Sequence, residues 1–151
     1  MVIQIDSREK PKAITKILNT FQSEGVEVIR SKLPYGDYMS LDNARLVVDR
    51  KQNLLEVASN FGMDEKRFTN EMKNASKVGI KIVFLVEHGQ NIKEIEDVAL
   101  WVNPRLKESP LALSGLRIYR KMLAYQNTYG VEFRFCTKAE TGKKIIEILG
   151  G

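Results

Sequence analysis

Ile80-Lys81-Ile82-Val83-Phe84-Leu85-Val86-Glu87 is the stretch that decides the fold of this 151-residue chain. It is apolar almost throughout and carries no regular alternation of polar residues. Such a run is typical of a strand that is covered on both faces, as in a sheet with helices packed above and below it. We therefore expect residues 80–87 to form the central strand of an α/β domain.

The N-terminal side of this stretch contains signals for three shorter strands and two helices. The strands are expected at residues 2–6, 26–33 and 45–51. Pro11 opens the first helix, which Gly25 ends, and Asp64 caps a second helix that runs through Lys77. Residues 34–38 form a turn around Gly36. Because this connection is short, we expect the strands at 26–33 and 45–51 to run antiparallel.

On the C-terminal side, helical periodicity continues after the central strand. Helices are expected at residues 92–102, 113–129 and 139–149, with a strand at 131–136 and an exposed loop at 103–110. Strands that alternate with helices predict one α/β domain over residues 1–151, with a mixed central β-sheet flanked by helices on both faces.

The composition restricts the kinds of function. Lys and Arg outnumber Asp and Glu by 24 to 19, which favours a polyanionic partner. One Cys and one His provide neither an internal disulfide nor a structural zinc site. No apolar stretch reaches the length of a membrane helix, and the first strand is not preceded by a basic region. We expect a cytoplasmic protein without a membrane partner, associated with the nucleoid, or a nuclear one if the source has a nucleus.

Three acidic segments lie where strands end or turn. They are Ile5-Asp6-Ser7-Arg8-Glu9, Tyr35-Gly36-Asp37-Tyr38 and Val48-Asp49-Arg50-Lys51. Side chains on a strand alternate in direction, so Asp49 and Lys51 share one face about 6.6 Å apart, whereas Arg50 points away. A carboxylate and an amine would then face the same substrate.

This set of residue types suits phosphodiester hydrolysis. The reaction needs a cation near the phosphate oxygens, a positioned water and stabilisation of the leaving oxygen. Asp37 and Asp49 are oxygen donors suited to Mg²⁺ or Mn²⁺, and Lys51 can orient the water or stabilise the transition state. Asp6 is a candidate further ligand. Taken singly, each residue also has a simpler interpretation, as a turn-former, an exposed strand end or a solvated lysine.

Taken together, the three segments resemble the XPF/Hef-type structure-specific nucleases. They match the DSRE strand end and the GD...ERK signature of that family, in the same order. The similarity continues through Arg67-Phe68 with Glu71, residues 82–87 and residues 113–141, so it covers essentially the whole chain. The resemblance implies a restriction-endonuclease-like fold.

The resemblance also implies roles for individual residues. Asp37 and Asp49 would be metal ligands, Lys51 the catalytic lysine and Asp6 a further acidic contributor. Arg50 and Arg8 would support the site or contact phosphate. Supporting positions would be Glu9, Glu56, Arg67 and Glu71.

The chain departs from the family pattern in three respects. The glutamate of the ERK motif is Asp49 here, which is one methylene shorter. The aspartate that usually follows the lysine by four residues is replaced by Leu55, and whether Glu56 substitutes for it is open. The tandem helix-hairpin-helix domain that members usually carry is not part of these 151 residues, so branch specificity does not carry over. The Gly150-Gly151 end fits either a natural terminus or a cut before another domain.

The expected function is that of a Mg²⁺- or Mn²⁺-dependent endonuclease that acts on branched or otherwise structured DNA in repair, recombination or replication. One alternative is a weak or inactive DNA-binding or dimerisation module of the same fold, and another is a resolvase or restriction-type nuclease. The resemblance also implies a homodimer through the late helix and strand, where Arg117, Arg120 and Lys121 form a basic stripe, and a helicase or helix-hairpin-helix partner.

Overall fold

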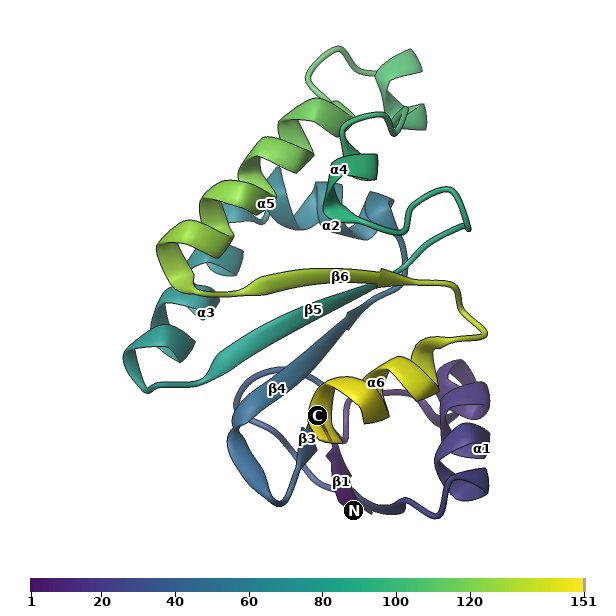
Figure 1. Ribbon diagram of the computed structural model, residues 1–151. Helices are drawn as coiled ribbons and strands as arrows, with labels where there is room; N and C mark the ends of the chain where they lie inside the picture. The colour runs from purple at the N-terminus through teal and green to yellow at the C-terminus, as the bar shows by residue number, and fades with distance from the viewer. Residues whose placement is uncertain (151) are drawn as a thin grey trace.

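A mixed six-stranded sheet forms the centre of the protein, as seen in the computed structural model, which describes residues 1–150 (Figure 1). The last position of the expected domain, Gly151, lies outside the described residues. The strand order is β2-β1-β3-β4-β5-β6, with bounds β1 Val2–Ile5, β2 Glu27–Arg30, β3 Tyr38–Ser40, β4 Asn43–Lys51, β5 Lys81–Glu87 and β6 Glu132–Cys136. β4, β5 and β6 are parallel, and β3 runs antiparallel to both β1 and β4.

Helices cover both faces of this sheet, as the sequence predicted (Figure 1). One face carries α2 Leu54–Phe61, α3 Glu65–Lys77, α4 Ile95–Val98 and α5 Gly115–Tyr129. The opposite face carries α1 Thr15–Ser23 and α6 Thr141–Gly150. Two 3-10 turns, Pro11–Ile14 and Pro104–Lys107, precede α1 and follow α4. Within residues 1–150, no helix combines the length and the apolar character needed to cross a membrane.

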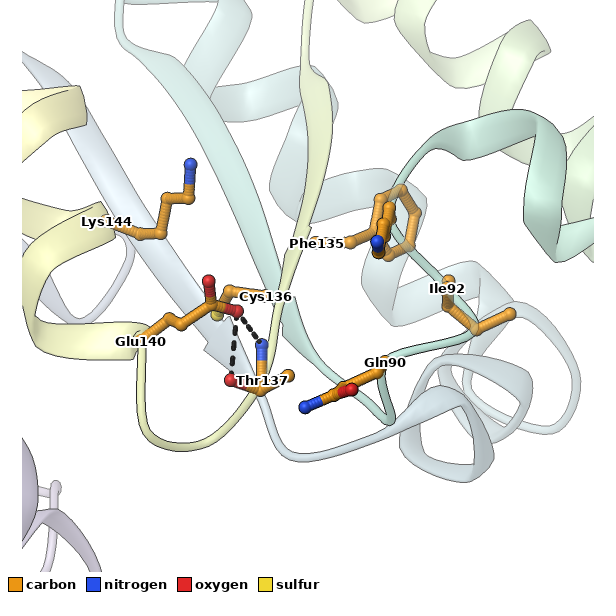
Figure 2. A pocket seen from close by; sticks show the side chains of 8 residues that line it. Gln90, Ile92, Phe135, Cys136, Thr137, Glu140 and Lys144 are labelled. Atoms are coloured by element: carbon orange, nitrogen blue, oxygen red, sulfur yellow. Dashed lines mark hydrogen bonds between the residues drawn. The ribbon is translucent and has the colours of Figure 1, made fainter.

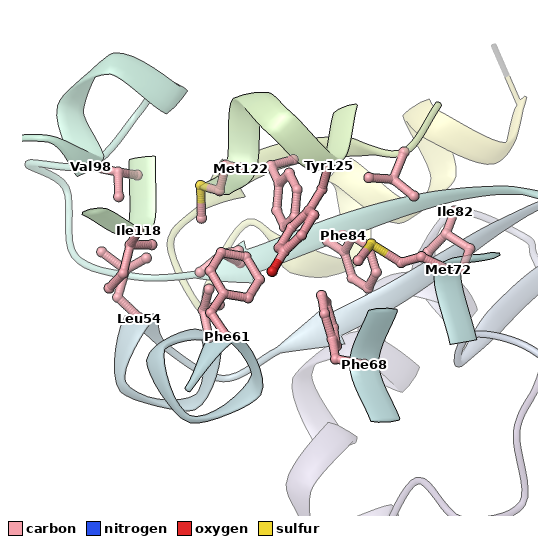
Figure 3. Packing of buried hydrophobic residues seen from close by; sticks show 14 of the residues in the cluster. Leu54, Phe61, Phe68, Met72, Ile82, Phe84, Val98, Ile118, Met122 and Tyr125 are labelled. Carbon is pink, nitrogen blue, oxygen red and sulfur yellow. The ribbon is translucent and has the colours of Figure 1, made fainter. Parts of the chain in front are cut away.

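Aromatic rings form a connected group within the core between the sheet and α2, α3 and α5 (Figure 3). The Phe61 ring lies edge-on to Tyr125, with centroids 5.0 Å apart, and Phe68 lies 5.1 Å from Phe84. Phe84 in turn stacks on Phe133 at 5.0 Å. The rings thus connect α2, α3 and α5 to β5 and β6, and such contacts stabilise beyond the area they bury.

The parallel strands bring their carboxyl ends to one edge of the sheet. In the pairing of β4 with β5, Asp49 lies opposite Phe84 and Lys51 lies opposite Val86. β3 then lies on the other side of β4, with Tyr38 opposite Val48. This arrangement places the residue before β3, Asp37, beside the end of β4.

Two expectations about elements were wrong, and two elements were missed. The strands at 26–33 and 45–51 are not antiparallel neighbours, because β2 pairs with β1 in parallel at the sheet edge and β3 is the antiparallel partner of β4. β3 and α2 were not predicted at all. The helix expected at 92–102 is only the single turn α4.

The Asp64 side chain makes no capping hydrogen bond to α3 and pairs instead with Arg67 at 3.5 Å.

Candidate active site

The side chains of Asp49 and Lys51 project from the C-terminal end of β4 toward α3. Lys51 Nζ lies 3.3 Å from Asp49 Oδ1, and both side chains are 12% exposed. The ammonium group also lies over the rings of Phe68 and Phe84, at 5.3 and 5.7 Å from their centroids. The ring faces attract the cation, so Lys51 is held in place on the same face as Asp49.

Asp37 reaches the site through a glycine turn. Gly36 has φ +71°, a conformation that favours glycine, and a Cβ there would lie 2.9 Å from the Val47 side chain. The backbone N–H of Asp37 donates to Val48 O at 2.8 Å. Its Oδ2 accepts from the Arg50 backbone N–H, also at 2.8 Å. The turn and the strand pairing therefore hold this carboxylate against β4.

An open cavity of about 410 Å³ brings the acidic segments together. Its wall includes the three central candidates and several supporting ones, among them Asp37, Asp49, Lys51, Arg8, Glu56 and Glu71. Residues from the β1 end, the β3 turn, β4, α2 and α3 thus meet in one hollow, which is the convergence that the sequence motifs predicted.

Burial and mutual repulsion disfavour ionisation of the carboxyl groups in this cavity. Burial, with added repulsion from Asp49 and Glu9, raises the pKa of Asp37 to about 8. Burial raises the pKa of Asp49 as well, against the opposing effect of Lys51. Burial and Asp49 together raise the pKa of Glu71. Clustered carboxylates with raised pKa values are stabilised as anions when a cation binds between them.

Lys51 keeps its charge in this environment. Burial opposes the ammonium form, but Asp49 and Glu56 outweigh it and hold the pKa of Lys51 above the ordinary value. The site therefore presents a fixed positive charge beside two carboxyl groups at neutral pH.

The Asp6 carboxylate organises the loop after β1 through hydrogen bonds. Its Oδ1 accepts from the Leu33 backbone N–H at 2.8 Å, and its Oδ2 accepts from Arg8 Nε at 2.7 Å. Burial opposes ionisation, but these hydrogen bonds outweigh it and lower the pKa of Asp6. Both oxygens already have donors, and the role of Asp6 as a metal ligand stays a prediction. Arg8, 65% exposed at the cavity rim, also donates from Nη2 to Leu33 O at 3.2 Å, and its contact with a phosphate stays a prediction.

Arg50 points to the opposite face of the sheet, as strand alternation predicted. Its Nε donates to Glu9 Oε1 at 2.8 Å and its Nη1 to Glu87 Oε1 at 2.6 Å. Tyr38 Oη donates to Glu9 and Thr141 Oγ1 donates to Glu87, at 3.0 and 2.7 Å. The Arg50 side chain is only 4% exposed, and its role in supporting the site stays a prediction.

The residues that complete this network were missed by sequence reasoning. Glu87 was noted only as the end of the apolar central strand, and Thr141 only as the end of a matching segment. A signal was available, because an arginine that projects from β4 into an apolar face requires a buried acidic partner.

Three positions from the comparison with the family pattern lie differently. Glu56 lines the cavity, but its Oε1 accepts a hydrogen bond from the Gln52 backbone N–H at 2.7 Å, just before the start of α2. Leu55 is 37% exposed and lines a separate hollow. Arg67 is 80% exposed and does not line the cavity. Whether Glu56 replaces the family aspartate stays a prediction.

No group of three or more His, Cys, Asp and Glu side chains among residues 1–150 is arranged to enclose a metal ion. Two carboxylates nevertheless suit Mg²⁺, which usually keeps several waters and takes one or two protein carboxylates plus substrate phosphates. Asp37 and Asp49 fit this mode because both line the cavity, Asp37 half-buried and Asp49 buried, and both are destabilised as anions.

A larger cavity, of about 590 Å³, lies beside β6 and the start of α6 (Figure 2). Within it, Glu140 accepts from the backbone and hydroxyl of Thr137, both at 2.9 Å, so this carboxylate is already used in the turn before α6. The lining holds no second carboxylate and no catalytic set. The smaller cavity is therefore the candidate active site.

Comparison with known proteins places this chain in a family. The ERCC4 domain matches residues 5–149. In sequence, no curated protein matches the chain significantly. Among solved structures, XPF from Aeropyrum pernix is similar, with a TM-score of 0.69, 21% identity and 99% of this chain covered. A second structure of that XPF, in complex with DNA, has the same TM-score and 23% identity over 99% of this chain. This chain spans 63% of the length of each. It therefore belongs to the ERCC4 domain family, a family of DNA nucleases, and has the XPF nuclease fold.

Proposed function

We propose that this protein is a divalent-metal-dependent endonuclease that hydrolyses phosphodiester bonds in branched or otherwise structured DNA. The observation that carries the proposal is the convergence of Asp37, Asp49 and Lys51 in one cavity, with carboxyl pKa values that burial raises. Membership of a nuclease family and the fold of XPF support it.

Each of the three residues has a role in this reaction. Asp37 and Asp49 would hold Mg²⁺ or Mn²⁺, and the bound ion would neutralise charge that develops on the phosphate. Lys51 Nζ orients the attacking water or donates to a phosphate oxygen of the transition state. The water oxygen bonds to phosphorus as the bond to the leaving sugar oxygen breaks, the water loses a proton and the leaving oxygen gains one.

DNA is the proposed partner on grounds of charge and fold. The chain carries a formal net charge of +5, and the exposed Arg8 guanidinium lies at the cavity rim. The similar XPF from Aeropyrum pernix has been solved with DNA bound. Repair, recombination or replication would supply such structured DNA, and a helicase or helix-hairpin-helix protein would select it.

Homodimerisation is a further part of this proposal. Leu116 and Leu123 on α5 are 44% and 40% exposed beside the basic stripe of Arg117 and Arg120. A second copy would cover these leucines. Sedimentation at several protein concentrations tests this, and a monomer at every concentration contradicts it.

Cleavage of fork, flap and nicked duplexes, with Mn²⁺ and with EDTA, tests the enzymatic part. Asp49→Asn and Lys51→Met should lower the cleavage rate about 100-fold or more, while folding and DNA binding persist. Lys81→Met is the matched control, because Lys81 pairs with Glu132 at 3.2 Å near the start of β5, away from the cavity.

Binding without cleavage by the wild-type protein would favour the alternative of a DNA-binding or dimerisation module. Cleavage confined to four-way junctions or to a fixed sequence would instead indicate a resolvase or a restriction-type enzyme. Equal cleavage by wild type and Lys51→Met would contradict the assigned role of Lys51.

A further inference from the structure

A buried charged network lies behind the candidate active site, on the α1 and α6 face of the sheet. Arg50 is its centre and bridges Glu9 and Glu87, at 2.8 and 2.6 Å. Tyr38 Oη and Thr141 Oγ1 each donate to one of these carboxylates. The network therefore joins the β1 loop, β3, β4, β5 and α6.

Because this network is buried, each of its charged groups needs a full set of hydrogen-bond partners. Arg50 and Glu87 have side chains only 4% exposed, so neither charge is screened by water. One oxygen of Glu87 accepts from Arg50 and the other from Thr141, so both carboxylate oxygens are used. Loss of either donor leaves a buried anion incompletely solvated, which is costly.

Arg50 also connects this network directly to the cleavage site. Its backbone N–H donates to Asp37 Oδ2 at 2.8 Å, and its two chain neighbours are Asp49 and Lys51. Side chains alternate along a strand, so fixing the Arg50 side chain on one face fixes the directions of Asp49 and Lys51 on the other. The position of the guanidinium thus sets the geometry of all three site residues.

Thr141 is itself held rigidly in place. It is fully buried at the first position of α6, and the next residue is Gly142. A Cβ on Gly142 would lie 2.7 Å from the Thr20 Cβ of α1, so the two helices are in backbone-close contact. The hydroxyl that reaches Glu87 therefore sits on a fixed support.

We propose that Glu87 and Thr141 are positioning residues of the nuclease site and act through Arg50. Neither residue lines the candidate active-site cavity. They hold the guanidinium on the α6 face and thereby hold the end of β4 in the conformation that directs Asp37, Asp49 and Lys51 into one cavity. The catalytic part of this inference rests on the proposed function, but the structural part does not.

Three variants separate positioning from general stability. Thr141→Val removes the hydroxyl without changing the shape of the side chain, Thr141→Ser keeps the hydroxyl, and Glu87→Gln removes the charge of the carboxylate. Asn103→Ala is the control, because Asn103 is 1% exposed and donates to Leu113 O at 2.8 Å but does not line the cavity. Steady-state cleavage of a fork with Mn²⁺ gives kcat and KM. The amide proton resonance of Arg50 reports its hydrogen bond to Asp37.

Thr141→Val and Glu87→Gln should lower kcat about tenfold with KM for DNA unchanged within about twofold, and Thr141→Ser should recover kcat within about twofold. In both impaired variants the Arg50 amide resonance should move upfield as its hydrogen bond lengthens. Asn103→Ala should change neither readout.

An unchanged Arg50 resonance in Thr141→Val and Glu87→Gln would overturn the inference, even if kcat falls. An equal loss of kcat in Asn103→Ala would also overturn it. If the wild-type protein cleaves no DNA, the proposed function fails, and the Arg50 resonance alone then decides the inference. A shift in the two network variants that is absent from Asn103→Ala would support it.

Discussion

At the scale of the residue, the candidate site contains carboxyl groups whose ionised form the fold destabilises. Asp37 is half-buried and Asp49 is buried in the same cavity, and loss of solvation raises the pKa of both. Such an arrangement lowers stability when no cation is bound, and active sites often show this conflict between stability and function. The conflict yields a prediction about pH.

Asp37→Asn should stabilise the metal-free protein by about 1–2 kcal/mol at pH 7. The pKa of Asp37 in the folded protein is about 8, above its ordinary value of 3.8, so between these values the folded state keeps a proton that the unfolded state has lost. Wild-type stability should therefore fall relative to the variant as pH rises from about 4 to about 8. Urea unfolding in EDTA across this range measures the difference. A gap that shrinks with rising pH would contradict the assignment.

Gly36→Ala should lower the free energy of unfolding by about 1–3 kcal/mol and impair cleavage, because a methyl group would meet Val47 at 2.9 Å. Gly25→Ala is the matched control: Gly25 has φ +72°, but a Cβ there has no atom within 4 Å. The control should lose only about 1 kcal/mol, from backbone strain alone. Urea unfolding of both variants gives the comparison, and equal losses would show that Val47 does not restrict the turn.

At the scale of the element, β4 is the strand that carries site residues on both of its faces. One face directs Asp49 and Lys51 to α3, and the other directs Arg50 to α6. Strand alternation alone predicted this division, and the apolar run of β5 predicted its covered neighbour. β3 was missed because it has only three residues, and α2 because its start depends on a cap by Asn53 that hydrophobic periodicity does not show.

The close contact of α6 with α1 predicts the sign of the stability change in a Gly142→Ala variant. In an unobstructed helix, Gly→Ala stabilises by about 1 kcal/mol. At Gly142 the added methyl group would meet Thr20 at 2.7 Å, so Gly142→Ala should instead destabilise by about 1–3 kcal/mol. Thermal and urea unfolding measure the change. A gain in stability would mean that α1 and α6 are not packed this closely.

At the scale of the whole molecule, the site gathers residues from five segments that are distant in sequence. The acidic motifs predicted Asp37, Asp49 and Lys51 because their types and spacing suit one reaction. Neither Glu87 nor Thr141 could be identified in this way, because their roles depend on the parallel register of β5 and on where α6 packs. Pairings between elements far apart in the chain leave no periodicity in the sequence.

The net charge of +5 gives a prediction about DNA binding. The association constant for a fork, measured by fluorescence anisotropy in EDTA, should fall as salt is added. A plot of its logarithm against the logarithm of the salt concentration should be linear, with a slope of about −0.9 for each phosphate contact. Arg8→Ala should reduce this slope by about one contact, because Arg8 is exposed at the cavity rim. Arg45→Ala, at an exposed position near the start of β4, should leave the slope unchanged. Equal slopes for wild type and Arg8→Ala would place Arg8 outside the DNA contact.

We propose above that Asp37, Asp49 and Lys51 form one metal-dependent hydrolytic site. Single-turnover cleavage of an end-labelled fork, followed as Mn²⁺ is titrated, tests it most directly. The cleavage rate should rise to saturation with Mn²⁺, disappear in EDTA and fall about 100-fold or more in Asp49→Asn at every concentration of the ion. Cleavage by the wild-type protein that persists in EDTA, or an Asp49→Asn variant that saturates at the wild-type rate, would contradict it.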